Sequence, residues 1–222
     1  MVSNSASNGD DEPGKNGFAK KAQALIKWLL SAAIDGGGPL PSAQDLAEEY
    51  LQRCNGDVEK AIQSLIVWQT SKGAGTGFLS GLGGLPVMPF TLPASMIASY
   101  GLGARLAAAI AHLRGYDLRC DSVRTTVLLS LLGDSVKELL KGAGIVIGLK
   151  VTHNLLKQLP GKILIEINRR IGFRLLTKFG EKGVINFVKM IPLVGGVIGA
   201  VFDSSFVFGC GKTAKQLFPK NS

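Results

Sequence analysis

The chain has 222 residues, of which 46% are hydrophobic and 18% are charged, and it contains 29 glycines. Its three cysteines, Cys54, Cys120 and Cys210, are too far apart for a disulfide framework or a zinc site, so a disulfide-rich secreted domain is excluded. The net charge of +9 belongs to the last third, because residues 150–222 hold twelve Lys and Arg but only three Asp and Glu. This asymmetry favours an anionic partner for that part of the chain.

Residues 1–17 are polar and acidic, which predicts a disordered tail. The segment has neither the apolar core of a secretory signal nor the basic character of a mitochondrial presequence, and Val2 excludes N-myristoylation. We therefore expect a cytoplasmic protein with a single helical domain over residues 18–218, followed by a short tail at 219–222.

Apolar residues recur at helical spacing over residues 18–34, 43–53 and 58–71. Glycines and prolines in 35–41 separate the first two helices, and Asn55-Gly56 predicts a turn between the next two. Ser42 with Asp45 three residues later predicts a capping box. The segment 42–72 is therefore a predicted helical hairpin that precedes an apolar and basic core at 73–218.

Residues 73–104 contain no charged side chain, but eight glycines and three prolines interrupt them. A simple membrane-spanning helix is therefore not expected, although the length exceeds the ~20 apolar residues that one needs. The pattern predicts a glycine-rich loop and then a helix that opens at Pro93 and ends near Arg114. A re-entrant or hairpin insertion of this segment stays open.

A further helix is predicted from about Asp121 to Lys141, with Asp134, Lys137, Glu138 and Lys141 on its polar face. Another is predicted over 149–159, with His153 on its polar face. No stretch alternates with the period of a strand, so the chain is predicted to be all-α, a single bundle of about seven to nine helices. Gly-x-x-x-Gly pairs predict close helix contacts, and these pairs are Gly77/Gly81, Gly144/Gly148 and Gly195/Gly199.

The bundle is expected to be organised around residues 162–203. Lys162, Glu166, Arg170, Arg174 and Lys178 recur every fourth residue and so share one helical face, beside an apolar face of Ile163, Ile167, Ile171 and Leu175. A basic helix with an apolar face is typical of a helix that lies at a membrane surface. Residues 191–202 are uncharged and glycine-rich.

Two groups of candidate site residues follow from this pattern. The predicted lipid-headgroup contacts are Lys162, Arg169, Arg170, Arg174, Lys178 and Lys182. The predicted apolar insertion or ligand groove consists of Ile191, Leu193, Val194, Gly195, Gly196, Val197 and Gly199. Asp203 follows this apolar stretch and, since an unpaired buried carboxylate is costly, is either a structural cap or pair or a functional carboxylate.

No motif predicts catalysis, a cofactor or a metal. Gly209-Cys-Gly-Lys-Thr213 lacks the first glycine of a P-loop, because Phe206 stands there, and is expected to be a helix terminus with a solvated lysine. The two histidines have no metal-ligand spacing. A nucleic-acid partner is not expected, since base-stacking aromatics are few and no known binding motif is present.

Four phrases together resemble the EcsC protein family, and the resemblance runs from about Ser42 to Phe218. The most specific phrase is Asn168-Arg-Arg-Ile-Gly-Phe-Arg-Leu-Leu-Thr-Lys-Phe-Gly-Glu-Lys-Gly183; the others are residues 81–93, 108–117 and 192–199. The family takes its name from a bacterial operon that also encodes an ABC transporter. The resemblance thus implies a link to membrane processes, but no reaction and no catalytic residues.

The sequence therefore predicts a helical protein that sits peripherally on, or partly inserted in, a membrane. There it would bind anionic lipid, an apolar lipid-like ligand or an integral membrane protein and assist a membrane or transport process. One alternative is a hydrolase on a lipid-derived substrate that uses Asp117, Asp134 or Asp203. The other is a soluble adaptor that binds a protein through its 42–71 hairpin. The oligomeric state stays open.

Overall fold

The computed structural model describes residues 13–36, 41–73, 94–145, 153–180 and 192–220. The protein is all-α, as predicted: this part of the chain holds nine α-helices and one 3-10 turn, without a strand. The predicted tail at 1–17 lies mostly outside it, but helix α1 (Pro13–Ile34) begins five residues before its predicted start at Phe18. A proline at the first helical position suits that start, because it has no backbone N–H to leave unsatisfied.

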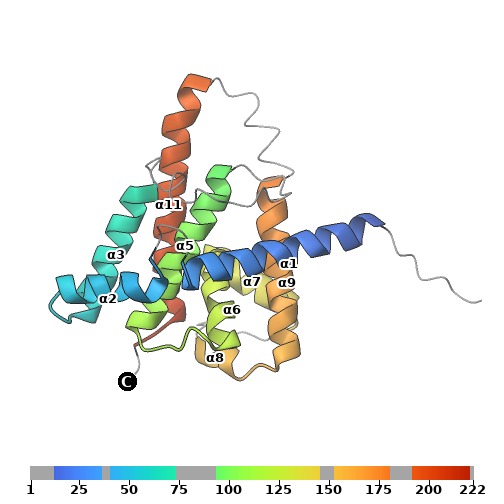
Figure 1. Cartoon of the computed structure of the whole chain (residues 1–222). Helices are drawn as coiled ribbons and strands as arrows, with labels where there is room; N and C mark the ends of the chain where they lie inside the picture. Colours follow the sequence, from blue (N-terminus) through green and yellow to red (C-terminus); the bar gives the residue numbers. More distant parts are fainter. Residues whose placement is uncertain (1–12, 37–40, 74–93, 146–152, 181–191, 221–222) are drawn as a thin grey trace, which may run out of the picture.

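Helix α5 (Ala94–Leu113) is the centre of the bundle, in place of the predicted 162–203 stretch. It packs against α1, α2 (Ala43–Arg53), α3 (Val58–Gly73), α6 (Asp121–Ser130) and α11 (Pro192–Leu217), which surround it in Figure 1. Small side chains allow this, since Ala104, Ala107, Ala108 and Ala111 are all fully buried. A helix whose sides are almost entirely apolar belongs in the core.

The predicted hairpin of α2 and α3 is confirmed in its local detail. Ser42 Oγ accepts a hydrogen bond from the Asp45 amide at 3.0 Å, while the Asp45 carboxylate accepts one from the Ser42 amide at 3.2 Å. The turn that follows uses Asn55 and Gly56, with φ of 51° and 81°. Both residue types tolerate this left-handed backbone, so the hairpin is specified by its own sequence.

Three glycines make close helix contacts in the described part of the chain, and of the six predicted packing glycines only Gly144 has described surroundings. A Cβ at Gly103 would lie 2.8 Å from Cys210 Sγ, one at Gly211 would lie 2.8 Å from Ile66, and one at Gly172 would lie 2.8 Å from the Ala22 carbonyl oxygen. Gly144 instead has a φ of +77° and would leave its Cβ in open space, so its prediction as a packing glycine was wrong. It terminates a helix, which is the common place for a left-handed glycine.

The helix predicted from Asp121 to Lys141 is two helices. After α6, Leu131 to Ser135 form turns and a 3-10 segment, η1 (Gly133–Ser135), before α7 (Val136–Gly142) begins. Gly133 has a φ of +55°, which an α-helix cannot contain. The four predicted polar residues are nevertheless exposed. The predicted helix over 149–159 is described only as the short α8 (His153–Lys157).

Helix α11 continues through Gly209-Cys-Gly-Lys-Thr213, so the prediction of a helix terminus there was wrong. Lys212 is exposed, as predicted, but Cys210, Gly211 and Thr213 are buried. Gly211 serves helix packing, because it lies against Ile66 of α3 and Leu106 of α5.

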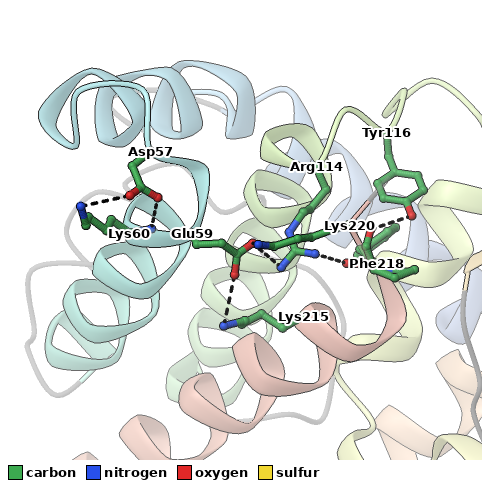
Figure 2. Close-up of polar contacts among 9 residues, drawn as sticks. Asp57, Glu59, Lys60, Arg114, Tyr116, Lys215, Phe218 and Lys220 are labelled. Atoms are coloured by element: carbon green, nitrogen blue, oxygen red, sulfur yellow. Dashed lines mark hydrogen bonds and ion pairs between the residues drawn. The ribbon is translucent and has the colours of Figure 1, made fainter. Parts of the chain in front are cut away.

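An ion-pair cluster around Glu59 holds the C-terminal end of α11 (Figure 2). Arg114, whose side chain is only 6% exposed, places Nη2 2.7 Å from Glu59 Oε1 and donates from Nη1 to the Phe218 carbonyl at 3.3 Å. Lys215 and Lys220 approach the same carboxylate at 3.7 and 3.8 Å. One carboxylate of α3 thereby joins the residue that follows α5, the last turn of α11 and the chain beyond α11.

The spacing of His153 predicted that it lies on a polar face, and this prediction was wrong. His153 lies in the core. It is 3% exposed, between the edge of Tyr116 and the ring of Phe218, with ring centroids 4.9 and 5.9 Å away. Its Nδ1 lies 3.1 Å from Thr126 Oγ1, and the Thr126 hydroxyl donates to the Ser122 carbonyl at 2.6 Å. Since the hydroxyl has one proton, we infer that Nδ1 carries a proton and donates to Thr126.

Burial, aided by the charge of Lys157, lowers the pKa of His153 below its ordinary value of 6.5. As the pH falls, His153 is therefore protonated at a higher pH in the unfolded chain than in the folded protein. The stability that neutral His153 contributes is fully present above pH 6.5 and is lost below it. We expect the free energy of unfolding to fall between about pH 7 and pH 5, and His153→Gln to flatten that fall. Urea titrations at several pH values measure the free energy of unfolding. An equal dependence of that free energy on pH in the variant and the wild type would contradict the prediction.

Candidate functional site

Helix α9 (Gly161–Gly180), which carries the predicted headgroup residues, lies along one side of the bundle, on α1, α6 and α7 (Figure 1). Its predicted apolar face packs inward: Ile167 and Ile171 are fully buried, Leu175 is nearly so, and Ile163 is half-buried. Tyr100 of α5 donates a hydrogen bond to the Leu175 carbonyl at 3.1 Å in the same interface. This apolar face is therefore core, and the prediction that it serves a membrane surface was wrong.

The outer face of α9 has apolar side chains of its own. Ile165 is 65% exposed and Phe173 is 56% exposed, and both are four residues from Arg169. Residues at this spacing lie one turn apart on the same side of a helix. Phe173 meets Phe18 of α1 edge to face, with ring centroids 5.1 Å apart. An apolar–arginine–apolar stripe thus faces away from the core.

The predicted basic residues of this face are partly neutralised by two glutamates. Arg169 donates two hydrogen bonds to Glu166, at 2.8 and 2.9 Å, and Arg170 donates a third at 2.7 Å. Arg174 reaches α7 and donates to Glu138 at 2.7 Å. The hydrogen bonds from Arg169, followed by the one from Arg170, lower the pKa of Glu166 to about 2. Glu166 therefore stays ionised at neutral pH.

A surplus of positive charge nevertheless remains on this surface. Lys162 is exposed, and the four described cations of α9, Lys162, Arg169, Arg170 and Arg174, face two carboxylates. Ion pairs fix the three guanidinium groups in place without cancelling the positive field. We call this surface the outer face of α9, and it consists of Lys162, Ile165, Glu166, Arg169, Arg170, Phe173 and Arg174.

The predicted site omitted Ile165 and Phe173. Along the chain, both residues fall between the basic residues of the helix. The adjacent row of isoleucines already accounted for an apolar face, so a second group of apolar residues was not considered. A helical projection of residues 162–178 places both of them on the charged side, so the signal was present in the sequence.

Several other predicted site residues are described only as backbone or not at all. Lys178 lies in the last turn of α9, while Lys182 and Ile191 lie outside the described residues. Leu193, Val194, Gly195, Gly196, Val197, Gly199 and Asp203 lie in the N-terminal half of α11. This half projects beyond the ends of α3 and α5, at the end of the bundle where α9 also terminates (Figure 1).

One helix in the described part of the chain has the length and hydropathy of a membrane span, at Met96–Leu113. Of that window, 89% is buried inside the bundle, as expected of the central helix of a globular domain. Residues 97–104, part of the uncharged segment whose insertion was left open, are thus core in this fold.

Of the carboxylates considered for hydrolysis, Asp117 and Asp134 are described, and the side chain of Asp203 lies outside the described part of the chain. Asp117 is exposed and accepts hydrogen bonds from the amide and the guanidinium of Arg119, which lower its pKa. Asp134 is exposed in η1. Among the described residues, no three His, Cys, Asp or Glu side chains are placed to hold a metal ion.

Comparison with models of protein families, with curated proteins and with solved structures finds no match to this chain. The resemblance to the EcsC family therefore stays a prediction.

Proposed function

We propose that the protein is a peripheral membrane protein that binds anionic lipid surfaces through the outer face of α9. One observation carries the proposal: exposed Ile165 and Phe173 flank Arg169 on a helix face with surplus positive charge. Isolated exposed apolar residues are ordinary on a protein surface. Apolar side chains that alternate with cations along one helix are typical of helices that bind the headgroup layer.

The expected energies are sufficient for reversible binding. Each surplus cation near an anionic bilayer contributes about 1 kcal/mol, and burial of one large apolar side chain contributes about 1.5 to 3 kcal/mol. Two surplus charges and two apolar side chains therefore support weak to moderate affinity that salt reverses.

The projecting half of α11 supports a deeper contact at the same end of the bundle. Residues 192–202 contain no charged side chain, and the helix leaves the rest of the bundle where α9 terminates (Figure 1). Its entry into the bilayer would add insertion to the surface contact of α9.

Liposome flotation tests the proposal. We expect the full-length protein to float with vesicles rich in phosphatidylserine, to float less with phosphatidylcholine alone, and to be released by high salt. Retention after a carbonate wash would indicate that the α11 segment also inserts. Absence of flotation with acidic vesicles at low salt would overturn the proposal.

Ile165→Asp should reduce binding to acidic vesicles by about tenfold, because it replaces an inserted apolar group by an anion. The matched control is Val67→Asp on α3, which changes a similarly exposed side chain (57%, against 65% for Ile165) on a different helix. Both variants should keep the wild-type helicity by circular dichroism, since both positions face solvent. Equal flotation of the two variants would remove the assignment to α9.

A further inference from the structure

Helices α3 and α11 run antiparallel and in contact, on the side of α5 away from α9 (Figure 1). Two contacts fix their register: Lys215 Nζ lies 3.7 Å from Glu59 Oε2, and Gly211 lies against Ile66. The glycine allows the two backbones to approach closely, so side chains on either side of the contact line stand beside one another. We call this line the α3–α11 seam.

One stripe of exposed or half-buried residues borders the seam on each helix. On α3 it runs through the exposed Lys60, Gln63 and Val67, and on α11 through the exposed Phe208 and Lys212 and the half-buried Lys215, at the i, i+3/i+4, i+7 spacing of one face. Val67 is 57% exposed and follows Ile66, while Phe208 is 52% exposed and precedes Gly211 by about one turn. Both apolar residues therefore lie at the end of the seam formed by the C-terminal part of α3.

The other end of the seam is cationic. Lys212 is exposed, and Lys215, Lys220 and Arg114 all face the one carboxylate of Glu59 (Figure 2). Lys60 pairs with Asp57 at 3.1 Å and adds no surplus. The lysine–carboxylate distances of 3.7 and 3.8 Å are long for charge-assisted hydrogen bonds, and Lys220 is largely exposed. These ammonium groups can therefore accept a further anionic partner.

We propose that the α3–α11 seam docks an amphipathic, acidic helix of a partner protein. Apolar side chains of that helix would cover Val67 and Phe208, and its carboxylates would meet Lys212, Lys215 and Lys220. Charge complementarity selects this occupant. A second copy of the same surface would bring like charges together, which disfavours a symmetric dimer through the seam.

The seam is separate from the outer face of α9. Because it lies on the other side of α5 from α9, a protein bound to a membrane through α9 leaves the seam facing water. The two surfaces together would let the protein connect a bilayer to an acidic soluble partner.

A synthetic peptide tests the seam on the full-length protein. The probe is a fluorescein-labelled peptide of about 18 residues, with leucines at i, i+3/i+4 spacing, glutamates beside them and alanines elsewhere. Its counterpart has lysine at every glutamate position. Fluorescence anisotropy should give at least tenfold tighter binding of the glutamate peptide, and binding should weaken with added salt.

Val67→Asp and Lys212→Glu should each weaken binding of the glutamate peptide about tenfold, while Ile165→Asp should leave it unchanged. In liposome flotation the expected pattern is the opposite: Ile165→Asp should weaken binding, whereas Val67→Asp and Lys212→Glu should leave it unchanged. Failure of the seam and failure of the α9 surface are therefore distinguishable. Absence of binding, equal binding of the two peptides, or glutamate-peptide binding unaffected by both seam variants would overturn the proposal.

Discussion

Glu59→Gln should lower the free energy of unfolding by about 2 to 3 kcal/mol. The substitution removes the charge that compensates Arg114, whose side chain is 6% exposed and lies 2.7 Å from Glu59. A buried cation without its counter-ion is strongly destabilising because water cannot replace the lost partner. This expected loss of stability is smaller than is usual for buried ion pairs, because Glu59 keeps about a third of its side chain exposed (35%). Urea denaturation followed by circular dichroism measures the loss.

Glu49→Gln provides the matched control for this substitution. Glu49 pairs with Arg53 one turn away on α2, and both side chains are largely exposed. A surface pair of this kind contributes at most about 0.5 kcal/mol. Equal losses in the two variants would show that the cluster around Glu59 does not hold α11 in solution. The Glu59 variant should also expose the C-terminal end of α11 to carboxypeptidase, because Arg114 binds the Phe218 carbonyl.

Gly172→Ala should destabilise the protein by about 2 kcal/mol, although alanine is the better helix former by about 1 kcal/mol. Its Cβ would lie 2.8 Å from the Ala22 carbonyl oxygen and 3.1 Å from Ala22 Cβ. The added Cβ would clash with the backbone of α1, and a backbone clash cannot be relieved by a change of rotamer. Helices α1 and α9 must therefore move apart, and the contact between Phe18 and Phe173 should be lost with them.

Gly209→Ala is the matched control, because it makes the same change at a position where the added Cβ has room. Gly209 lies inside α11, and a Cβ there would have no neighbour within 4 Å. This variant should gain about 0.5 to 1 kcal/mol from helix propensity alone. A neutral or stabilising result for Gly172→Ala would mean that α1 and α9 do not cross at this distance.

Local sequence determined most of the secondary structure. The Ser42 capping box, the Asn55-Gly56 turn and the helix after Pro93 each depend on residues within a few positions of one another. Backbone sterics and short-range hydrogen bonds decide such features, so they can be predicted without the fold. The break after α6 was missed because its leucines continue the helical spacing through Gly133, the one residue that departs from it.

Tertiary packing decided which faces of these helices are available for function. The sequence could show that α9 is basic on one side and apolar on the other, but not that Ile167 and Ile171 would be covered by the bundle while Ile165 and Phe173 stay exposed. Likewise, the contacts between Glu59 and Arg114 and between Gly172 and Ala22 join residues far apart in the chain. A helical period specifies faces relative to one another, whereas the choice of the buried face depends on which other helix covers it. That choice made α5 the centre of the fold and left the outer face of α9 and the α3–α11 seam at the surface.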